Sequence, residues 1–371
     1  MKAALLVEPG SPLEVGEVEL EGPRAGEVLV RVEAAGICHS DYHYMAGDLR
    51  CRLPAVLGHE GAGIVEAVGP GVTRVAEGQA VCLLWRPRCG ECRHCLAGHA
   101  ELCVEGRALA TSGGLLDGTS RLRVEGVAAY HFLGVSCFAE ACVVPERSVV
   151  PVPEGVPLEV AAIAGCAVIT GVGSVLNAIG ACSGQGVVVL GAGGVGCAAV
   201  MGAASGGAFP VVAVDRNPEA LELARRVGAT HSVTAGEGDL LEAIAEACPG
   251  GADWSIEAIG RPDTLRAAIS CLRPGGTAVA VGLAPLGATV EVTINEIVQQ
   301  EKHLRGSLYG SATPALELPR LFGLYLAGRL PLERLLGGRY RLEEVNTAYA
   351  ELLAGRPGRS VIVPPGSGAG R

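Results

Sequence analysis

Four cysteines within fifteen residues constrain this chain most. Cys89, Cys92, Cys95 and Cys103 are spaced C-x2-C-x2-C-x7-C in the sequence CGECRHCLAGHAELC. A tetrahedral zinc ion needs four donors at about 2.3 Å, and short C-x2-C steps let a tight turn supply them. Four thiolates leave no coordination position open, so the spacing predicts a zinc site that holds a loop together and carries out no reaction.

Composition narrows the class of protein. The chain has 371 residues, enough for two domains with large cores, and it is 49% hydrophobic with 55 glycines. These values favour an α/β protein. A net charge of −10 gives no electrostatic reason to expect nucleic acid or a membrane surface as a partner. The first residues, MKAALLVEPG, lack a signal-peptide pattern. We therefore expect a cytoplasmic protein whose 14 cysteines are metal ligands or buried side chains, although a disulfide framework is the alternative.

The sequence pattern that predicts secondary structure changes near residue 168. Before it, alternating segments such as 27–36 and 63–72 predict a β-rich region. After it, repeated strand–helix units predict a doubly wound parallel sheet. Residues 160–214 contain no Asp, Glu, Lys, Arg or His, but glycine turns interrupt them. Buried parallel strands explain this apolar run better than a membrane span. The tail 365–371, PGSGAGR, is expected to be disordered.

A glycine motif at the start of the second region predicts a nucleotide site. The motif GAGGVG comprises Gly191, Ala192, Gly193, Gly194, Val195 and Gly196. It follows a predicted apolar strand and precedes a predicted helix, the context in which G-x-G-x-x-G binds a pyrophosphate. Asp215 ends the next strand, where a carboxylate binds the ribose hydroxyls and favours NAD over NADP. The alternatives are a strand-end cap at Asp215 and a weaker preference caused by Arg216.

A second set of metal-type residues is scattered along the chain. Cys38, His59 and Cys166 each lie in or beside a glycine-bounded turn. A catalytic zinc site has three protein ligands and one open position. Their residue types alone do not show whether the three side chains bind one metal ion, because no short sequence spacing links them.

Five motifs occur together and in order: GICHSDYH, LGHEGAG, the four-cysteine segment, GCAVITGVGS and VVVLGAGGVG. With them the chain resembles the zinc-containing medium-chain alcohol dehydrogenases over nearly all of residues 1–363. The resemblance implies an α/β protein with a GroES-like, β-rich catalytic domain of residues 1–167 and 309–371. It also implies a Rossmann coenzyme domain of residues 168–308, with the active site in the cleft between the two.

The resemblance also implies roles for individual residues. Two zinc ions per subunit are implied, a catalytic ion on Cys38, His59 and Cys166 and a structural ion on Cys89, Cys92, Cys95 and Cys103. Glu60 matches a nearby acid, and Asp41 matches the carboxylate that orients the ligand histidine. Ser40 and His43 match a proton relay, although a turn residue and a surface imidazole are the plain alternatives. Further contacts to NAD are implied for His39, Thr170, Gly191, Gly193, Gly194, Val195, Gly196, Asp215, Arg216 and Arg359.

The implied reaction is reversible hydride transfer between an alcohol and NAD, in which zinc lowers the pKa of the alcohol. Large apolar residues match the family's substrate pocket and suit medium-chain or aromatic primary alcohols, although core packing is the alternative. These residues are Trp85, Phe132, Leu133, Leu283 and Leu308. The long segment between Cys103 and Phe132 resembles the dimeric branch of the family, so we expect a homodimer.

Other functions remain open at this point. Asp48 and Arg107 match positions at which glutathione-dependent formaldehyde dehydrogenases read their substrate, so an S-(hydroxymethyl)thiol of glutathione or mycothiol is an alternative. Arg50 stands where that pattern has a second acid, and reversing a recognition charge is costly. Two rivals of other classes are a zinc-free reductase and a non-enzymatic nucleotide-binding protein of the same fold. The complete set of ligand and relay residues argues against both.

Overall fold

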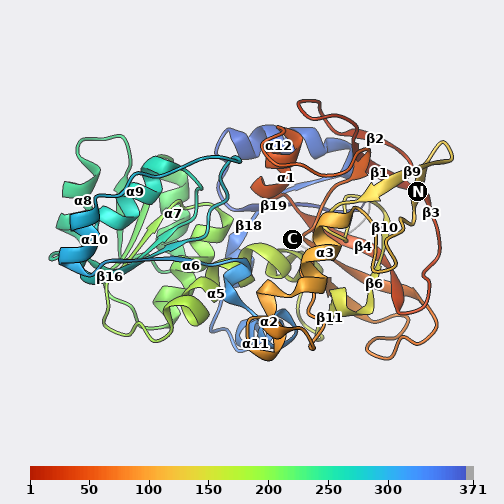
Figure 1. The fold of residues 1–371 in the computed structure, drawn as a ribbon, viewed down its shortest axis with the longest axis horizontal. Helices are drawn as coiled ribbons and strands as arrows, with labels where there is room; N and C mark the ends of the chain where they lie inside the picture. The colour runs from red at the N-terminus through yellow and green to blue at the C-terminus, as the bar shows by residue number, and fades with distance from the viewer. Residues whose placement is uncertain (365–371) are drawn as a thin grey trace.

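A parallel sheet forms one half of the molecule (Figure 1). The structure, a computed structural model, describes residues 1–364, so the predicted disorder of 365–371 lies outside the described residues. The strand order is β14-β13-β12-β15-β16-β17. These strands are β12 (Val187–Leu190), β13 (Val211–Asp215), β14 (His231–Thr234), β15 (Ala252–Glu257), β16 (Leu272–Ala280) and β17 (His303–Gly306). The helices that follow them are α6 (Gly194–Ser205), α7 (Pro218–Arg226), α8 (Leu240–Ala247), α9 (Pro262–Ser270) and α10 (Ile294–Gln300).

This half confirms the predicted doubly wound sheet. Strand β12 is buried along its whole length, as expected when helices cover both faces of a parallel sheet. Helix α7, which follows β13, ends at Arg226. It ends there because Gly228 adopts a φ of +124°, which reverses the chain toward β14.

Strands that pair mostly in antiparallel fashion form the other half, which we call the antiparallel half. One sheet has the order β11-β7-β6-β4-β19-β18, with β10 also paired to β4, and the second has the order β2-β1-β5-β9-β8-β3. The first sheet contains β4 (Glu27–Gly36), β6 (Gly61–Val68), β7 (Ala80–Leu83), β10 (Ala141–Pro145), β11 (Val149–Pro151), β18 (Leu336–Tyr340) and β19 (Arg359–Ile362). The second contains β1 (Lys2–Leu6), β2 (Glu14–Glu17), β3 (Glu19–Leu20), β5 (Ala55–Val56), β8 (Leu122–Val124) and β9 (Val127–His131). Helices α1 (His39–Met45), α2 (Arg93–Leu96) and α3 (Val104–Ser112) interrupt these strands.

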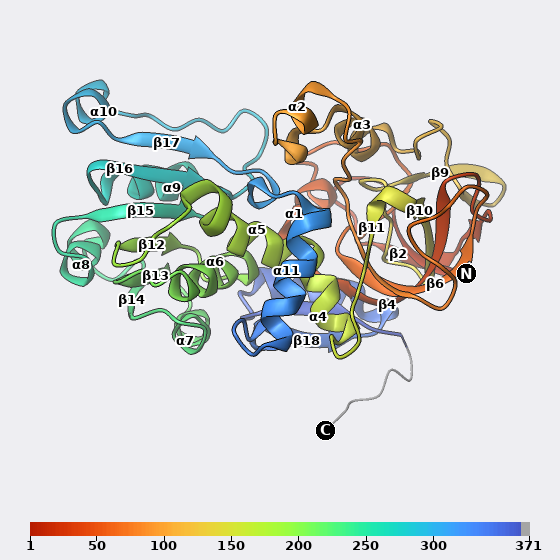
Figure 2. The same cartoon turned by 90° about the horizontal axis from the view of Figure 1, so that it is seen from below.

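One long helix joins the two halves (Figure 2). It spans Leu158–Ile179 and consists of α4 (Leu158–Ile163), α5 (Ile169–Gly173) and the π-helical segments Ala164–Val168 and Ser174–Ile179. Glycines let it approach both halves closely. A Cβ on Gly165 would lie 2.7 Å from the Leu83 carbonyl oxygen of β7, and one on Gly171 would lie 2.3 Å from the Val195 carbonyl oxygen of α6.

The long helix accounts for much of the charge-free run at residues 160–214. It is apolar and long enough to cross a membrane, but 78% of its most apolar window is buried inside the protein. It is therefore a core helix, in agreement with the prediction that this run is buried inside the protein and does not span a membrane. The expectation of strands was only partly right, because strands form the later part of the run, at β12 and β13.

The chain returns to the antiparallel half at its end. Helices α11 (Pro314–Leu326) and α12 (Val345–Leu353) lead to β19. Strand β19 pairs antiparallel with β4, with Val361 opposite Gly36. This pairing places Arg359 beside residues that lie more than 290 positions earlier in the sequence.

Candidate functional site

A buried group of metal-type side chains lies where two strands meet the long helix. Strand β4 ends at Gly36 just before Cys38, and β6 begins at Gly61 just after His59 and Glu60. The two strands are antiparallel neighbours, and the Gly36 amide donates a hydrogen bond to the Glu60 carbonyl at 2.6 Å. Cys166 comes from the middle of the long helix. The fold therefore brings Cys38, His59, Glu60 and Cys166 together, which local spacing did not predict.

The donor atoms of this group fit one metal ion. The ligand atoms of Cys38, His59, Glu60 and Cys166 all lie within 4.8 Å of one another, and each residue is at most 6% exposed. A tetrahedral zinc site with bonds of 2.0–2.3 Å has edges of about 3.3 to 3.8 Å. The Cys166 sulfur lies 3.3 Å from His59 Nε2, which matches such an edge. The chemistry and spacing of these donors are those of a candidate zinc site.

Neighbouring groups prepare the donors for a cation. Asp41 is fully buried on α1, and its Oδ1 lies 3.0 Å from His59 Nδ1. In the neutral ring, this contact holds the imidazole proton on Nδ1 and leaves Nε2 with a free lone pair. A hydrogen bond with Cys166 lowers the pKa of the Cys38 thiol well below its usual value, against the effect of burial, and the charges of Arg359 and His59 lower it further. A thiolate is the form that binds zinc.

A buried ion pair links this group to the glycine-rich loop. Arg359 donates hydrogen bonds from Nη2 and Nε to Glu60 Oε2 at 2.6 and 3.0 Å, and both residues are at most 4% exposed. The Arg359 Cδ lies 3.2 Å from where a Cβ on Gly194 would be. Burial raises the pKa of the Glu60 carboxyl to about 7, and Arg359 opposes that rise. Sequence reasoning gave these two residues separate roles and missed the contact between them.

The loop itself has the geometry that the motif predicted. Strand β12 ends at Leu190, and Gly193 is the N-cap of α6. Asp215 is half-buried at the end of β13, and its carboxylate accepts hydrogen bonds from the amides of Ala192 at 2.7 Å and Asn217 at 2.9 Å. Asp215 thus acts as a strand-end cap in this structure while it remains next to the loop. Arg216 is exposed beside it, and Thr170 is half-buried in α5.

Helix α1 carries the predicted relay residues. Ser40 and His43 are half-buried one turn apart, and the rings of His39 and His43 lie 5.6 Å apart. Burial lowers the pKa of His39, and His43 lowers it further. His43 Nδ1 lies 2.8 Å from Asp48 Oδ2. From the sequence, Asp48 was predicted only as a substrate-reading acid, and its contact with His43 was not predicted.

The predicted pocket residues divide into two groups. The rings of Trp85 and Phe132 lie edge-on to His59, with centroids 6.2 and 6.0 Å away. Leu133 and Leu308 are half-buried, whereas Leu283 is 46% exposed. Apolar side chains therefore adjoin the candidate metal site, and of the two rings Phe132 is fully buried whereas Trp85 is half-buried.

The four-cysteine segment forms the second candidate zinc site. The ligand atoms of Cys89, Cys92, Cys95 and Cys103 lie within 4.8 Å of one another, with 3.9 Å between the sulfurs of Cys89 and Cys95. Backbone amides point at the sulfurs: the Cys89 amide lies 3.2 Å from the Cys103 sulfur, and the Cys92 amide lies 3.3 Å from the Cys89 sulfur. Backbone hydrogen bonds also lower the pKa of Cys92 to about 6. All four donor atoms of this candidate site are cysteine sulfurs, which is the donor set that the spacing indicates.

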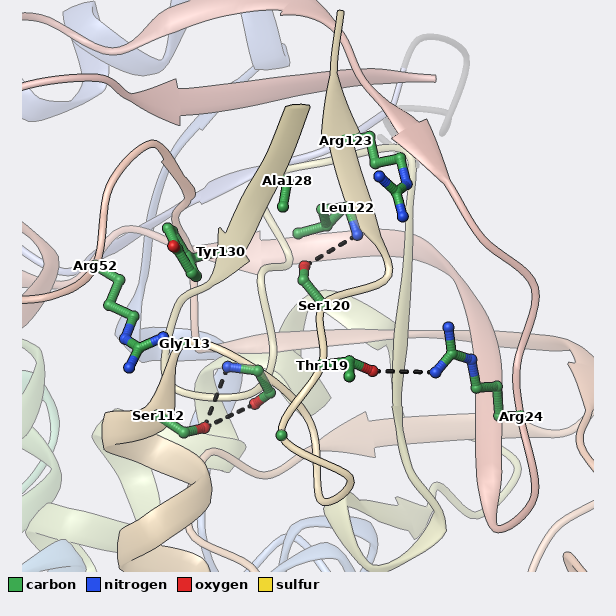
Figure 3. A pocket seen from close by; sticks show the side chains of 12 residues that line it. Arg24, Arg52, Ser112, Gly113, Thr119, Ser120, Leu122, Arg123, Ala128 and Tyr130 are labelled. Carbon is green, nitrogen blue, oxygen red and sulfur yellow. Dashed lines mark hydrogen bonds between the residues drawn. The ribbon is translucent and has the colours of Figure 1, made fainter. Parts of the chain in front are cut away.

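A separate cavity of about 330 Å³ lies in the antiparallel half, against β8 and β9 (Figure 3). Arg24, Arg52 and Arg123 line it. Arg24 and Arg123 both form ion pairs with Glu21, and Arg52 lies over the ring of Tyr130. Because most of its charge is already neutralised, we assign this cavity no part in the site.

Comparisons with known proteins agree with this geometry. Residues 24–154 match the family described as alcohol dehydrogenase GroES-like domain, and residues 194–323 match zinc-binding dehydrogenase. An NDMA-dependent alcohol dehydrogenase from Amycolatopsis methanolica is 41% identical over 98% of both chains. An S-(hydroxymethyl)glutathione dehydrogenase from Paracoccus denitrificans is 35% identical over 98% of this chain and 99% of its own. The crystal structure of benzyl alcohol dehydrogenase from Acinetobacter calcoaceticus has a TM-score of 0.92 at 33% identity, and covers 98% of this chain and 99% of that one.

Proposed function

Because this chain belongs to the zinc-binding medium-chain alcohol dehydrogenase family and is an NAD(P)-dependent oxidoreductase, we propose that it oxidises medium-chain or aromatic primary alcohols with NAD. One observation carries the proposal. The buried group of Cys38, His59, Glu60 and Cys166 is joined through Arg359 to the glycine-rich loop. A metal-type site and a nucleotide-type site therefore lie within the reach of one side chain.

We assign the catalytic zinc to Cys38, His59 and Cys166, with Glu60 as a nearby acid, and the structural zinc to the four cysteines of the lobe. When bound, the catalytic zinc supplies Lewis acidity that lowers the pKa of the substrate hydroxyl. Asp41 keeps His59 in the tautomer whose Nε2 can bind a metal. Ser40 and His43 carry the proton away from the hydroxyl, and histidine suits this task because its ordinary pKa is near neutral.

Coenzyme choice and substrate class have separate supports. The carboxylate of Asp215 at the end of β13 supports NAD, because it would repel a 2′-phosphate. We assign the coenzyme to the glycine motif with Asp215 and Arg216, and to His39, Thr170 and Arg359. The aromatic rings of Trp85 and Phe132 beside His59 support an alcohol with a large apolar group. The relative named for benzyl alcohol agrees with this size.

We further propose a homodimer, formed through the free edge of the parallel sheet. Strand β17 lies at that edge with all of its residues exposed. Beside it, Ile294 and Val298 of α10 are 78% and 66% exposed, and Leu304 of β17 is 48% exposed. An open strand edge next to exposed apolar side chains pairs readily with a second copy of the same surface. The variant Val298→Glu should sediment as a monomer, whereas Leu96→Glu, at a site 75% exposed in the cysteine lobe, should not.

Two other assignments belong to the same proposal. We divide the chain into a catalytic domain of residues 1–167 and 309–371 and a coenzyme domain of residues 168–308. We also propose a cytoplasmic location, because thiolate zinc ligands need a reducing compartment.

An S-(hydroxymethyl)thiol substrate is the second candidate. The Paracoccus relative is named for the glutathione adduct, and Arg107 is exposed and available to bind a carboxylate. However, Asp48 is bound to His43, and Arg50 has the opposite charge to the acid expected at its position. We therefore rank this candidate second.

The deciding experiment follows NADH formation by the purified protein. One arm contains NAD with benzyl alcohol or hexanol, and the other contains NAD with formaldehyde plus glutathione or mycothiol. Activity on the plain alcohols that is lost with a zinc chelator supports the proposal, and activity with thiol adducts alone replaces it with the second candidate. A third arm, with NDMA as electron acceptor, follows from the name of the Amycolatopsis relative. If a preparation is inactive, its zinc content distinguishes a protein that does not use zinc, such as a zinc-free reductase or a nucleotide-binding protein, from a zinc enzyme that has been damaged.

A further inference from the structure

The turn after helix α1 folds an acidic side chain back onto His43. Helix α1 ends at Met45, and Gly47 adopts a φ of +84° that reverses the chain. The Leu49 amide then donates a hydrogen bond to the His43 carbonyl at 3.0 Å. Asp48, between these two residues, is therefore held close to the helix by the backbone.

The contact between the two side chains is short and specific. Asp48 Oδ2 lies 2.8 Å from His43 Nδ1, and the two side chains are 33% and 13% exposed. The only other titratable ring in contact with His43 among the described residues is that of His39 on the same helix. No other ion pair of Asp48 is found in residues 1–364. The carboxylate is thus committed to His43.

We propose that Asp48 is a positioning residue that holds His43 in the tautomer that accepts a proton at Nε2. This inference rests on the proposed function, in which His43 carries the proton of the alcohol. A carboxylate at Nδ1 keeps the Nδ1 proton in place and leaves the Nε2 lone pair free. When Nε2 takes up the proton released by the substrate, the resulting imidazolium lies 2.8 Å from a negative charge. The imidazolium then returns that proton from Nε2 to water, and Nδ1 keeps its own.

The same turn also contacts the half of the molecule that contains the parallel sheet. The Leu286 amide, in the loop between β16 and α10, approaches the Asp48 carbonyl at 3.4 Å. The position of Asp48 is therefore tied to both halves, as a residue that sets the geometry of a proton exit between them requires. Asp48 is also poorly suited to bind a thiol adduct, because its carboxylate already contacts His43.

Asp48→Ala, Asp48→Asn and Asp48→Glu test the inference, with Arg50→Gln as the matched control. Arg50 lies two residues away and is exposed. The first readout is the ¹⁵N NMR signature of the His43 ring, identified by its loss in His43→Gln. We expect the Nδ1–H tautomer in the wild type and in Asp48→Glu, and a mixture of tautomers in Asp48→Ala.

The second readout is steady-state oxidation of benzyl alcohol. We expect kcat to fall about tenfold or more in Asp48→Ala at nearly constant KM, to fall less in Asp48→Asn, and to recover in Asp48→Glu. Arg50→Gln should match the wild type. An unchanged His43 tautomer in Asp48→Ala, or a kcat no lower than that of Arg50→Gln, overturns the inference. Failure of the wild type to oxidise any alcohol refutes the proposed function instead, and the NMR signature still decides the role of Asp48.

Discussion

Two glycines of the GAGGVG motif distinguish a requirement of folding from a requirement of coenzyme binding. A Cβ on Gly196 would lie 1.7 Å from the Gly191 carbonyl oxygen, well inside any tolerated contact. Gly196→Ala therefore forces the backbone to move by about 1.3 Å, and overpacking of this kind costs about 1–3 kcal/mol. We place this variant at the upper end, because the obstacle is backbone and cannot rotate away. A Cβ on Gly193, in contrast, meets nothing within 4 Å, and its φ of −74° and ψ of −169° suit any residue.

Gly193→Ala should consequently fold at least as well as the wild type, with a stability change of less than about 1 kcal/mol in its favour. Its new methyl group would occupy the space above the N-terminus of α6 that we assign to the pyrophosphate. We expect the Kd for NADH to rise by tenfold or more in this variant, an effect of about 1.4 kcal/mol or more. Urea unfolding and a fluorescence titration with NADH measure the two quantities on the same samples. A Gly193→Ala variant that binds NADH like the wild type would refute the placement of the coenzyme over this loop.

Further predictions concern the buried polar network and the zinc sites. Glu27→Gln removes one partner of Arg121, which is fully buried, and should lower the free energy of unfolding by about 3 kcal/mol; a loss under about 1 kcal/mol in urea unfolding would contradict this. Burial lowers the pKa of His131 to about 3, so between about pH 6.5 and pH 3 the unfolded chain binds the extra proton and stability falls as the pH falls. In His131→Gln this dependence should flatten by up to about 1.4 kcal/mol per pH unit, and equal slopes for the two proteins would count against a neutral buried ring. Cys103→Ser should reduce the zinc content from two ions to about one per chain and lower stability, and two ions retained would show that the lobe does not bind zinc through this residue.

Site residues that lie close together in the sequence were predictable, whereas site residues that lie far apart in the sequence were not. The cysteine lobe and the glycine motif were predictable because each is a local pattern whose ligand atoms come from one turn of chain. The group of Cys38, His59 and Cys166 was not predictable from spacing, because the pairing of β4 with β6 and the path of the long helix bring it together. Only the resemblance to a family grouped these residues in advance.

Side-chain partners were the least predictable feature. The contact between His43 and Asp48 depends on the positive φ of Gly47, and a glycine after a short helix would have been its only signal. The pair formed by Glu60 and Arg359 left no signal at all, since the two residues lie almost 300 positions apart in the sequence. The prediction of strands was wrong at residues 158–179, where the structure has a long helix, because the sequence again contained no signal. An unbroken apolar run has no periodicity that distinguishes a buried helix from a buried strand.

The ion pair between Glu60 and Arg359 has an energetic implication for the site. Two charges that are both almost fully buried lose several kcal/mol of hydration each, and their mutual attraction seldom returns more than that. Stability alone is therefore a weak reason for this pair. Its position supplies a better one, because Glu60 belongs to the metal-type group and Arg359 lies against Gly194 of the glycine-rich loop. A negative pyrophosphate at that loop would compete with Glu60 for Arg359, and a cation at the metal group would compete with Arg359 for Glu60. The two sites would then influence each other through one shared pair of side chains, without any larger change in the fold.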